Sequence, residues 1–432
     1  MTQSRPGGPE GNGRTRSGKA GFIREYNRWL VANLLRREGP LSRADLASRL
    51  GLSAPAVSRI VEGLIRQGYV EETGLAHTAV GRRPRMLGIR AEAGSVVAVD
   101  LRRVDRVEVG LVDLQGCLVG SRERRLESLE PAAVVAEIGR LAREVVSEWG
   151  GSRPRPMAVG LACPGVIDFE RGTVEYSAHL LWRDVPIRSM LSEELGLPTV
   201  VDTDCNAPAL AESWLGAGAT VDHLVYLALG PGLGVGIVVG GSVYRGASGA
   251  AGELGHTVVQ VEGGRRCRCG NWGCAETFLS DEAIVQSARD AGVDVGAPSE
   301  GDGPAAVARV FAAARDGDEA ARLVVERVSR ALEVLVLNIL NLLNPQLLVV
   351  DAQRGAEEEL LAVARRAAEH CALPLVGRAA RIETPTLGDK TVLVGAAMLV
   401  LERFWQAPVF DIEVNYRGLA GTRSIGREPG AV

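Results

Sequence analysis

Four metal-ligating side chains form the sharpest cluster in this chain of 432 residues. His256 is followed by the run Cys267-Arg-Cys269-Gly-Asn-Trp-Gly-Cys274. Three thiolates and one imidazole complete a tetrahedral zinc shell and leave no coordination position open. The pattern therefore predicts one structural, non-catalytic zinc per chain, held by His256, Cys267, Cys269 and Cys274. The alternative is a set of free thiols in a turn.

The other composition features fit a cytoplasmic protein. Seven cysteines, an odd number, do not favour a disulfide framework and indicate a reducing compartment. The N-terminus has no apolar signal-peptide core. The longest apolar stretch, Leu332 to Val350, is interrupted by polar residues and falls short of a membrane helix. We expect no membrane partner.

Charge is distributed unevenly along the chain. Residues 1–90 hold 16 Lys and Arg against 7 Asp and Glu, a net charge of +9. The remaining 342 residues hold 33 against 46, a net charge of −13, and the two parts sum to −4. A basic head on an acidic body indicates that the head binds a polyanion.

The head carries a helix-turn-helix pattern. Apolar residues at helical spacing predict a helix over 22–37, a short second helix from Ser42 that Gly51 ends, and a third from Ser53 to about Gln67. Packing of the apolar positions leaves one face of the third helix for a DNA major groove. The candidate contacts on this face are Ser53, Ala54, Ala56, Ser58 and Arg59. A protein-binding trihelical module is the alternative.

A basic hairpin follows the third helix. Tyr69–Glu72 and Met86–Ile89 are expected strands, and the segment between them ends in Gly81-Arg82-Arg83-Pro84-Arg85. Arg82, Arg83 and Arg85 suit DNA phosphates or a narrow minor groove. The alternative is a solvated charged turn with no partner. The basic hairpin and the helix-turn-helix together favour double-stranded operator DNA as a partner.

Beyond residue 94 the pattern becomes α/β and repeats. Three strands, a helix over 131–149 and a strand over 157–163 form the first unit, and strands over 223–229, 234–240, 242–244, 256–261 and 347–351 with further helices form the second. Two similar halves imply two lobes with a cleft between them. The expected domains are a disordered arm at 1–20, a winged helix-turn-helix at 21–90, lobe 1 at 94–218 completed by a helix at 390–405, lobe 2 with the zinc site at 219–389, and a tail at 406–432.

Several motifs together resemble the ROK family of sugar kinases and sugar-responsive repressors. Glu253-Leu-Gly-His256 precedes the cysteine run and Glu276, and the further matching stretches are Cys163-Pro-Gly-Val-Ile-Asp168, Leu180-Leu-Trp182, Asp202-Thr-Asp204-Cys-Asn206 and Gly230-Pro-Gly232-Leu-Gly234-Val-Gly236. The head with its Gly-Arg-Arg-Pro ending is similar to the repressor branch. The resemblance implies an actin-like, hexokinase-like (ribonuclease H-like) fold.

The resemblance also implies a sugar site. Asp204 matches the carboxylate that takes a proton from the sugar hydroxyl in the kinases, and without ATP it could only hold the sugar. Glu253 and Glu276 match carboxylates that bind hydroxyls near the anomeric end, or they orient the metal ligands instead. His179 stands where many relatives carry a sugar-binding Asn. The full expected set is His179, Asp204, Asn206, Glu253, His256 and Glu276.

Departures from the family pattern separate a regulator from a kinase. The first phosphate loop of the family, Asp-x-Gly-Gly-Thr, reads Asp100-Leu-Arg102-Arg103-Val here, and Asp351-Ala-Gln353 replaces a Gly-Gly turn. Backbone cannot approach a triphosphate closely without glycine. The remaining glycine-rich stretch, 230–236, also suits a hairpin.

We therefore predict a sugar-responsive DNA-binding repressor, a homodimer or tetramer without catalytic residues, in which Asp204 is a degenerate kinase base. The alternative is an ATP-dependent sugar kinase with an appended DNA-binding head.

Overall fold

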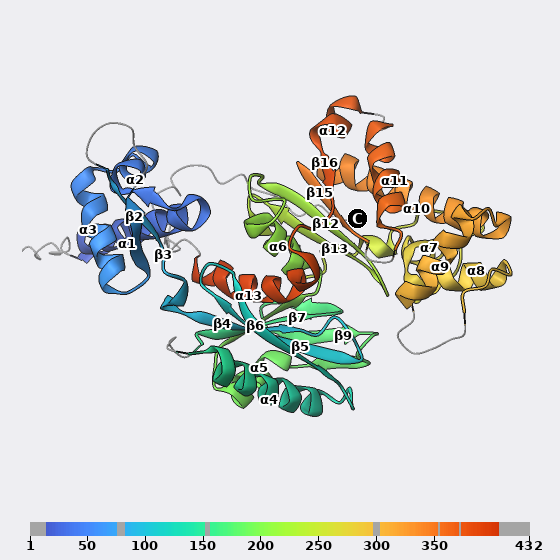
Figure 1. Ribbon diagram of the computed structural model, residues 1–432, viewed down its shortest axis with the longest axis horizontal. Helices are drawn as coiled ribbons and strands as arrows, with labels where there is room; N and C mark the ends of the chain where they lie inside the picture. Colours follow the sequence, from blue (N-terminus) through green and yellow to red (C-terminus); the bar gives the residue numbers. More distant parts are fainter. Residues whose placement is uncertain are drawn as a thin grey trace, which may run out of the picture.

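The computed structural model describes residues 14–75, 83–151, 156–296, 303–352, 355–370 and 373–405. Figure 1 shows a small helical head, in blue, beside a body of two lobes. Each lobe is built around its own five-stranded sheet. This architecture confirms the expected division into a head and a duplicated α/β body.

The head is a winged helix-turn-helix. Its elements are α1 (Arg14–Glu38), β1 (Leu41–Ser42), α2 (Arg43–Leu50), α3 (Ala54–Arg66), β2 (Val70–Leu75) and β3 (Arg85–Ile89), with the strands in the order β1-β3-β2. Ser42 and Asp45 cap α2 reciprocally, and Gly51 ends it with a φ of 63°. Buried Val57, Val61 and Leu64 hold α3 against the rest of the head.

One expectation about the head differs from the structure. The sequence predicted a disordered arm over residues 1–20, but α1 already begins at Arg14. Once the packed part of α1 is formed, adding residues to its N-terminus costs little, because helix propagation is far easier than nucleation. Residues 1–13 of the expected arm and the expected tail at 406–432 lie outside the described residues.

Lobe 1 begins after a short 3₁₀ turn, η1 (Ala91–Ala93). Its main sheet has the order β11-β7-β4-β5-β6. The strands and helices are β4 (Ser95–Asp100), β5 (Arg106–Asp113), β6 (Leu118–Arg125), α4 (Pro131–Trp149), β7 (Ala158–Cys163), α5 (Ile187–Leu195), β11 (Thr199–Thr203) and α6 (Asn206–Leu215). A second small sheet contains β8 (Val166–Asp168), β9 (Thr173–Ser177) and β10 (Trp182–Val185).

Lobe 2 repeats this topology with the order β14-β13-β12-β15-β16. Its elements are β12 (His223–Leu229), β13 (Leu233–Val239), β14 (Ser242–Val243), η2 (Leu254–His256), α7 (Glu276–Leu279), α8 (Asp281–Asp290), α9 (Gly303–Arg315), α10 (Glu319–Leu343), β15 (Leu347–Asp351), α11 (Glu357–Glu369), α12 (Pro374–Ala379), β16 (Arg381–Glu383) and η3 (Gly388–Lys390). In both lobes an antiparallel meander of three strands continues into two parallel strands.

The expected strand over 256–261 is absent among the described residues of lobe 2. The chain forms the 3₁₀ turn η2 and then a single bridge between Val258 and Cys274. The amides of Val259 and Gln260 both donate to the Gly273 carbonyl, which folds this segment onto the cysteine run. The segment therefore pairs with the cysteine run next to His256 and does not form a regular strand.

Helix α13 (Thr391–Phe404) completes lobe 1, as the sequence predicted. It is buried along nearly its whole length, and it lies between the sheet of lobe 1 and α6 (Figure 1). Gly395 permits this close approach, because a Cβ at that position would lie 2.2 Å from the Ala207 carbonyl oxygen. Helices α6 and α13 therefore pack closely against each other.

Candidate functional site

The turn between β11 and α6 places Asp204 on the lobe 1 side of the cleft. The Asp204 amide donates to the Cys163 carbonyl at 3.2 Å, which ties the turn to the end of β7. Burial raises the pKa of Asp204 to about 6, although Arg102 acts in the opposite direction. Such a carboxylate is ionised at neutral pH and costly to leave without a hydrogen-bond donor.

Two carboxylates enter the cleft from lobe 2. Glu253 precedes η2 and Glu276 begins α7, so both flank the cysteine run. His256 lies between them, with Nε2 at 3.8 Å from Glu253 Oε2 and Nδ1 at 3.6 Å from Glu276 Oε2. Burial raises the pKa of Glu253. The structure thus brings three of the expected sugar-binding residues together.

His179 approaches the same space from lobe 1. A Cβ added at Gly232 would lie 3.4 Å from His179 Nε2 and 3.5 Å from Glu276 Oε1. His179 and Glu276 therefore border one space across the two lobes. Burial lowers the pKa of His179, and the nearby Arg268 lowers it further, so the imidazole is neutral at pH 7 and can both donate and accept a hydrogen bond.

Asn206 is buried at the start of α6, beside the Asp204 turn. Its side chain is only 1% exposed, and its Nδ2 donates to Asp202 Oδ1 at 2.7 Å. Its Oδ1 finds no hydrogen-bond partner among the described residues. Through its hydrogen bond to Asp202, Asn206 stabilises the turn that carries Asp204, and the sugar contact that the resemblance implied stays a prediction.

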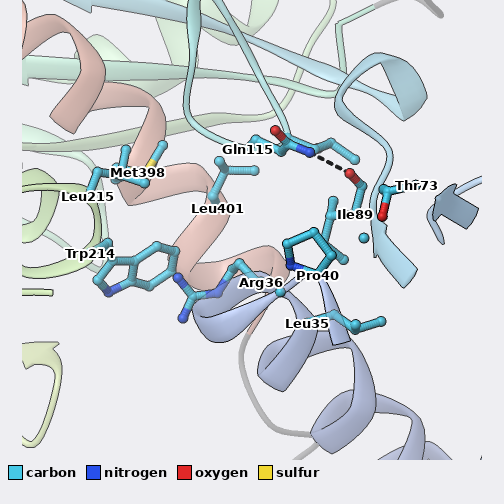
Figure 2. Close-up of a pocket in the computed structure, with 13 residues that line it drawn as sticks. Leu35, Arg36, Pro40, Thr73, Ile89, Gln115, Trp214, Leu215, Met398 and Leu401 are labelled. Carbon is cyan, nitrogen blue, oxygen red and sulfur yellow. Dashed lines mark hydrogen bonds between the residues drawn. The ribbon is translucent and has the colours of Figure 1, made fainter. Parts of the chain in front are cut away.

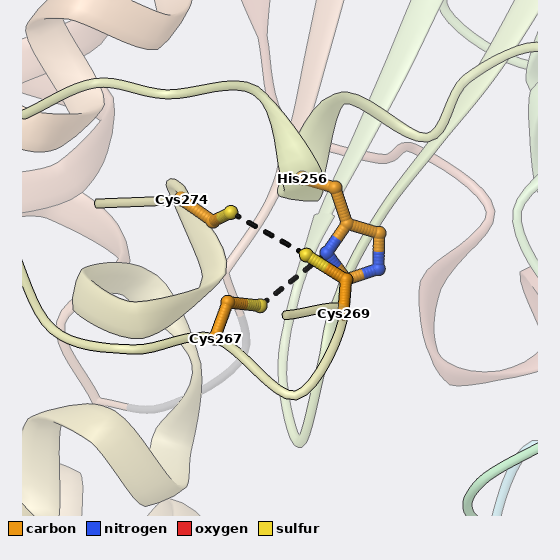
Figure 3. Close-up of side chains that lie close together, drawn as sticks. All are labelled: His256, Cys267, Cys269 and Cys274. Carbon is orange, nitrogen blue, oxygen red and sulfur yellow. Dashed lines mark hydrogen bonds between the residues drawn. The ribbon is translucent and has the colours of Figure 1, made fainter. Parts of the chain in front are cut away.

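The expected metal ligands converge at the edge of the cleft (Figure 3). One donor atom from each of His256, Cys267, Cys269 and Cys274 lies within 4.8 Å of the others. Cys267 Sγ is 3.5 Å from His256 Nδ1, and Cys269 Sγ is 3.7 Å from Cys274 Sγ. Zn–S bonds of about 2.3 Å place tetrahedral sulfur ligands about 3.8 Å apart. The donor set fits a zinc ion in both chemistry and spacing.

Arg102 occupies the loop where the family pattern has glycine. Its guanidinium lies 3.6 Å from Asp100 Oδ2, and its electrostatic neighbours include Asp204 of lobe 1 and Asp351 of lobe 2. Burial lowers the pKa of Arg102, but these carboxylates outweigh burial and the net shift is upward. A protein cation therefore stands between the lobes beside Asp204.

The second glycine-rich stretch forms the β12–β13 hairpin. This confirms the hairpin interpretation of residues 230–236. Gly234 is required for packing, because a Cβ there would lie 2.1 Å from Cys205 Sγ in the Asp204 turn. Packing against Cys205 thus explains the glycine at position 234 without a nucleotide.

The expected DNA-contacting residues gather on the head. Ser53, Ala54 and Arg59 are exposed, and Ala56 and Ser58 are half-buried on the same helix. At the base of the wing, Arg83 is exposed, and Arg85 pairs with Glu72. Arg82 lies outside the described residues. Arg59 on α3 and Arg83 at the wing are therefore exposed cations that could contact DNA phosphates.

Sequence reasoning missed the junction between head and body, shown in Figure 2. A cavity of about 300 Å³ lies there, lined by residues of α1, the wing, α6 and α13. Arg36 of α1 reaches across it and stacks 3.7 Å from the ring centroid of Trp214, near the end of α6. Arg36 and Trp214 are too far apart in sequence for any periodic pattern to reveal their contact.

Comparison with known proteins decides the family. The pattern of the ROK family matches residues 104–403, more than half of the chain. The chain belongs to the ROK family. Residues 25–79 match the MarR family, which covers most of the winged helix. No helix in the described part of the chain is long and apolar enough to span a membrane.

Members of both branches of the family are similar to this chain. A xylose repressor of Caldicellulosiruptor bescii is 28% identical over 90% of this chain and 98% of its own length. A glucokinase of Halalkalibacterium halodurans is 34% identical over 57% of this chain and 77% of its own. The crystal structure of a ROK family transcriptional regulator, a homologue of the E. coli Mlc protein, has a TM-score of 0.74 at 26% identity, covering 89% of this chain and 97% of the other.

Proposed function

We propose that this ROK protein is a transcriptional repressor that binds operator DNA through its winged helix and releases it when a sugar binds between the lobes. One observation carries the proposal: a MarR-type head precedes a ROK body that keeps the carboxylates of the cleft but places Arg102 where a phosphate loop needs glycine. The full-length likeness to a xylose repressor, head included, supports it.

The effector in this proposal is a neutral monosaccharide with adjacent hydroxyls. Asp204, Glu253 and Glu276 accept hydrogen bonds from hydroxyls, and His256 and His179 complete the space. Ionised carboxylates suit hydroxyl donors, because charge-assisted hydrogen bonds are the stronger kind. D-xylose is the first sugar to test, followed by D-glucose and N-acetylglucosamine. Binding to the native state raises the melting temperature, so a thermal-shift screen identifies the ligand.

The alternative is a sugar kinase with a DNA-binding head. The raised pKa of Asp204, to about 6, would suit a general base. Against it, Arg102 and Arg103 stand where the resemblance implies glycine, and their bulk would occupy the approach that a triphosphate needs. We expect the protein to release no ADP above background from Mg-ATP with any of the three sugars. Sugar-dependent ADP release in a coupled assay would establish the kinase instead.

A structural zinc belongs to the same proposal. His256, Cys267, Cys269 and Cys274 would hold it, and a bound zinc supplies folding energy to the loop without offering an open coordination position. Held in this way, the cysteine run fixes Glu253 and Glu276 on either side of His256.

We further propose that the protein acts in the cytoplasm as a homodimer or tetramer on a palindromic operator. A winged helix reads a short half-site, and two-fold symmetry doubles the contacts that one head can make. Sedimentation of the protein with and without operator duplex tests this. A 1:1 complex of one chain with the duplex contradicts it.

A further inference from the structure

Arg245 forms a buried ion-pair triad below the cleft. It follows β14 in lobe 2, and its Nε donates to Asp202 Oδ2 at 2.7 Å while its Nη2 donates to Glu402 Oε2 at 3.2 Å. The side chains are 16%, 3% and 6% exposed, respectively. The guanidinium also lies 3.8 Å from the ring centroid of Phe169. Desolvating three charges costs free energy. We therefore expect the triad to fix the relative positions of β14, β11 and α13 more than it stabilises the fold.

The first connection of Arg245 leads to the turn that carries Asp204. Asp202 Oδ1 accepts hydrogen bonds from Asn206 Nδ2 at 2.7 Å and from the Thr203 amide at 2.8 Å. These two donors flank Asp204 on either side. Because both oxygens of Asp202 are engaged, a displacement of the turn also displaces the carboxylate that holds Arg245.

The second connection leads to Glu253 on the opposite lobe. The Arg245 carbonyl accepts the Ala251 amide at 3.1 Å, which closes the loop that follows β14. Glu253 comes two residues after this closure. The Asp204 turn is therefore linked to the Arg245 guanidinium through Asp202, whereas the Glu253 loop is linked to the Arg245 backbone.

The third connection leads to the DNA-binding head. Glu402 lies on the last turn of α13, which also carries Phe404. The Phe404 ring lies 5.8 Å from the ring of Tyr69, and Trp29 Nε1 of α1 donates to the Trp405 carbonyl. The end of α13 thus contacts two elements of the head.

We propose that Arg245 is the positioning residue through which sugar in the cleft changes operator affinity. The inference rests on the proposed function and assigns the route by which the sugar acts. A ligand shifts an equilibrium only by its differential affinity for two arrangements. Closure of the lobes on a sugar moves the Asp204 turn and the Glu253 loop together, and Arg245 passes this movement through Glu402 to α13 and the head.

Two variants and one control separate coupling from general stability. Arg245→Met removes the cation and keeps the length of the side chain. Glu402→Gln removes the charge of the partner on α13 and leaves the Arg245–Asp202 contact in place. It decides the matter if Arg245→Met fails to fold. Arg403→Met is the matched control, because Arg403 also lies over Phe169, at 4.5 Å, but on the exposed side of α13.

The first measurement is operator affinity by fluorescence anisotropy, on a duplex selected by the wild-type protein from a random pool. Titrations are run with and without saturating D-xylose, D-glucose or N-acetylglucosamine. Coupling in the usual range would weaken wild-type binding about tenfold or more. In Arg245→Met and Glu402→Gln, we expect sugar to weaken operator binding less than about threefold, while the sugar affinity measured by calorimetry stays at the wild-type value. In Arg403→Met, sugar should weaken operator binding as much as in the wild type. Wild-type release by both test variants overturns the inference.

A measurement without sugar distinguishes failure of the proposed sugar effector from failure of the proposed role of Arg245. If none of the sugars acts on the wild type, the proposed effector class is wrong, and hydrogen–deuterium exchange of the full chain then decides the role of Arg245. Arg245→Met and Glu402→Gln should increase exchange in α1 and β2 of the head, although both residues lie outside it. Unchanged exchange in the head overturns the inference, as does an equal increase in Arg403→Met.

Discussion

At the scale of single residues, the cleft uses a carboxylate that the fold holds at a cost. The pKa of Asp204 is raised from 3.8 to about 6, first by burial. The native state therefore binds the Asp204 proton more tightly than the unfolded chain, so stability falls as the pH rises from about 4 to about 6. Sugar hydroxyls that donate to the ionised carboxylate would offset this cost.

Replacement of Asp204 should make this cost visible. Without sugar, Asp204→Asn should have a higher melting temperature than the wild type at pH 7.5, and the difference should shrink toward pH 4. Thermal unfolding at both pH values measures it, with exposed Glu369→Gln as a control that changes little at either pH. A lower melting temperature of Asp204→Asn at pH 7.5 would show that the ionised carboxylate is stabilising.

The metal ligands allow a second test at this scale. Cys269 is an exposed member of the cluster, so Cys269→Ser removes a ligand without opening the core. We expect about one equivalent of zinc in the wild type by elemental analysis and a clear loss in Cys269→Ser, together with weaker sugar binding. Exposed Cys117, which lies in lobe 1, provides the control Cys117→Ser. Metal-free wild type with full sugar binding contradicts the structural zinc.

At the scale of elements, α3 and the wing should contribute differently to DNA binding. Arg83→Ala should weaken binding to all duplexes and lower the salt slope by about one, as expected for one lost phosphate contact. Arg59→Ala should weaken selected operator more than random DNA, because a base-edge contact carries sequence information. Arg330→Ala serves as the control, because the Arg330 side chain on α10 is exposed. An equal loss on both DNAs would assign Arg59 to the backbone.

The elements also show what sequence can and cannot predict. Helix α4 and strands β12 and β15 have the predicted bounds, because each carries a clear period or an uninterrupted apolar run. The segment after His256 was wrongly predicted as a strand, since its conformation follows from the cysteines that fold back on it. The sugar-binding residues that the resemblance implied stay a prediction, and the burial of Asn206 could not be predicted from sequence because it depends on tertiary packing.

At the scale of the whole molecule, the head–body contacts join residues with no sequence relation. Arg36 and Trp214 meet at the junction cavity (Figure 2). Burial lowers the pKa of Arg36 to about 10, and Arg37 adds to this. A cation–π contact contributes about 0.5–2 kcal/mol, depending on its desolvation, so this stacking favours the observed orientation of the head.

Loss of this stacking should loosen the head. Trp214→Leu should increase hydrogen exchange in the second half of α1 about fivefold or more, while leaving lobe 2 unchanged. The control is Trp149→Leu, which removes a similar contact with Arg122 in lobe 1. Exchange in α1 at the wild-type rate would mean that the remaining junction contacts hold the head without Trp214.

The most direct test of the account asks whether the cleft controls the head. Operator affinity is measured by anisotropy for wild type and Asp204→Asn, with and without the sugar found by thermal shift. We expect sugar to weaken wild-type binding about tenfold or more. Asp204→Asn should bind operator equally well without sugar. It should stay bound at the sugar concentration that gives half-maximal release of the wild type, because a lost charge-assisted bond of about 1.5–3 kcal/mol lowers sugar affinity at least tenfold. Release of Asp204→Asn at that sugar concentration would contradict the account.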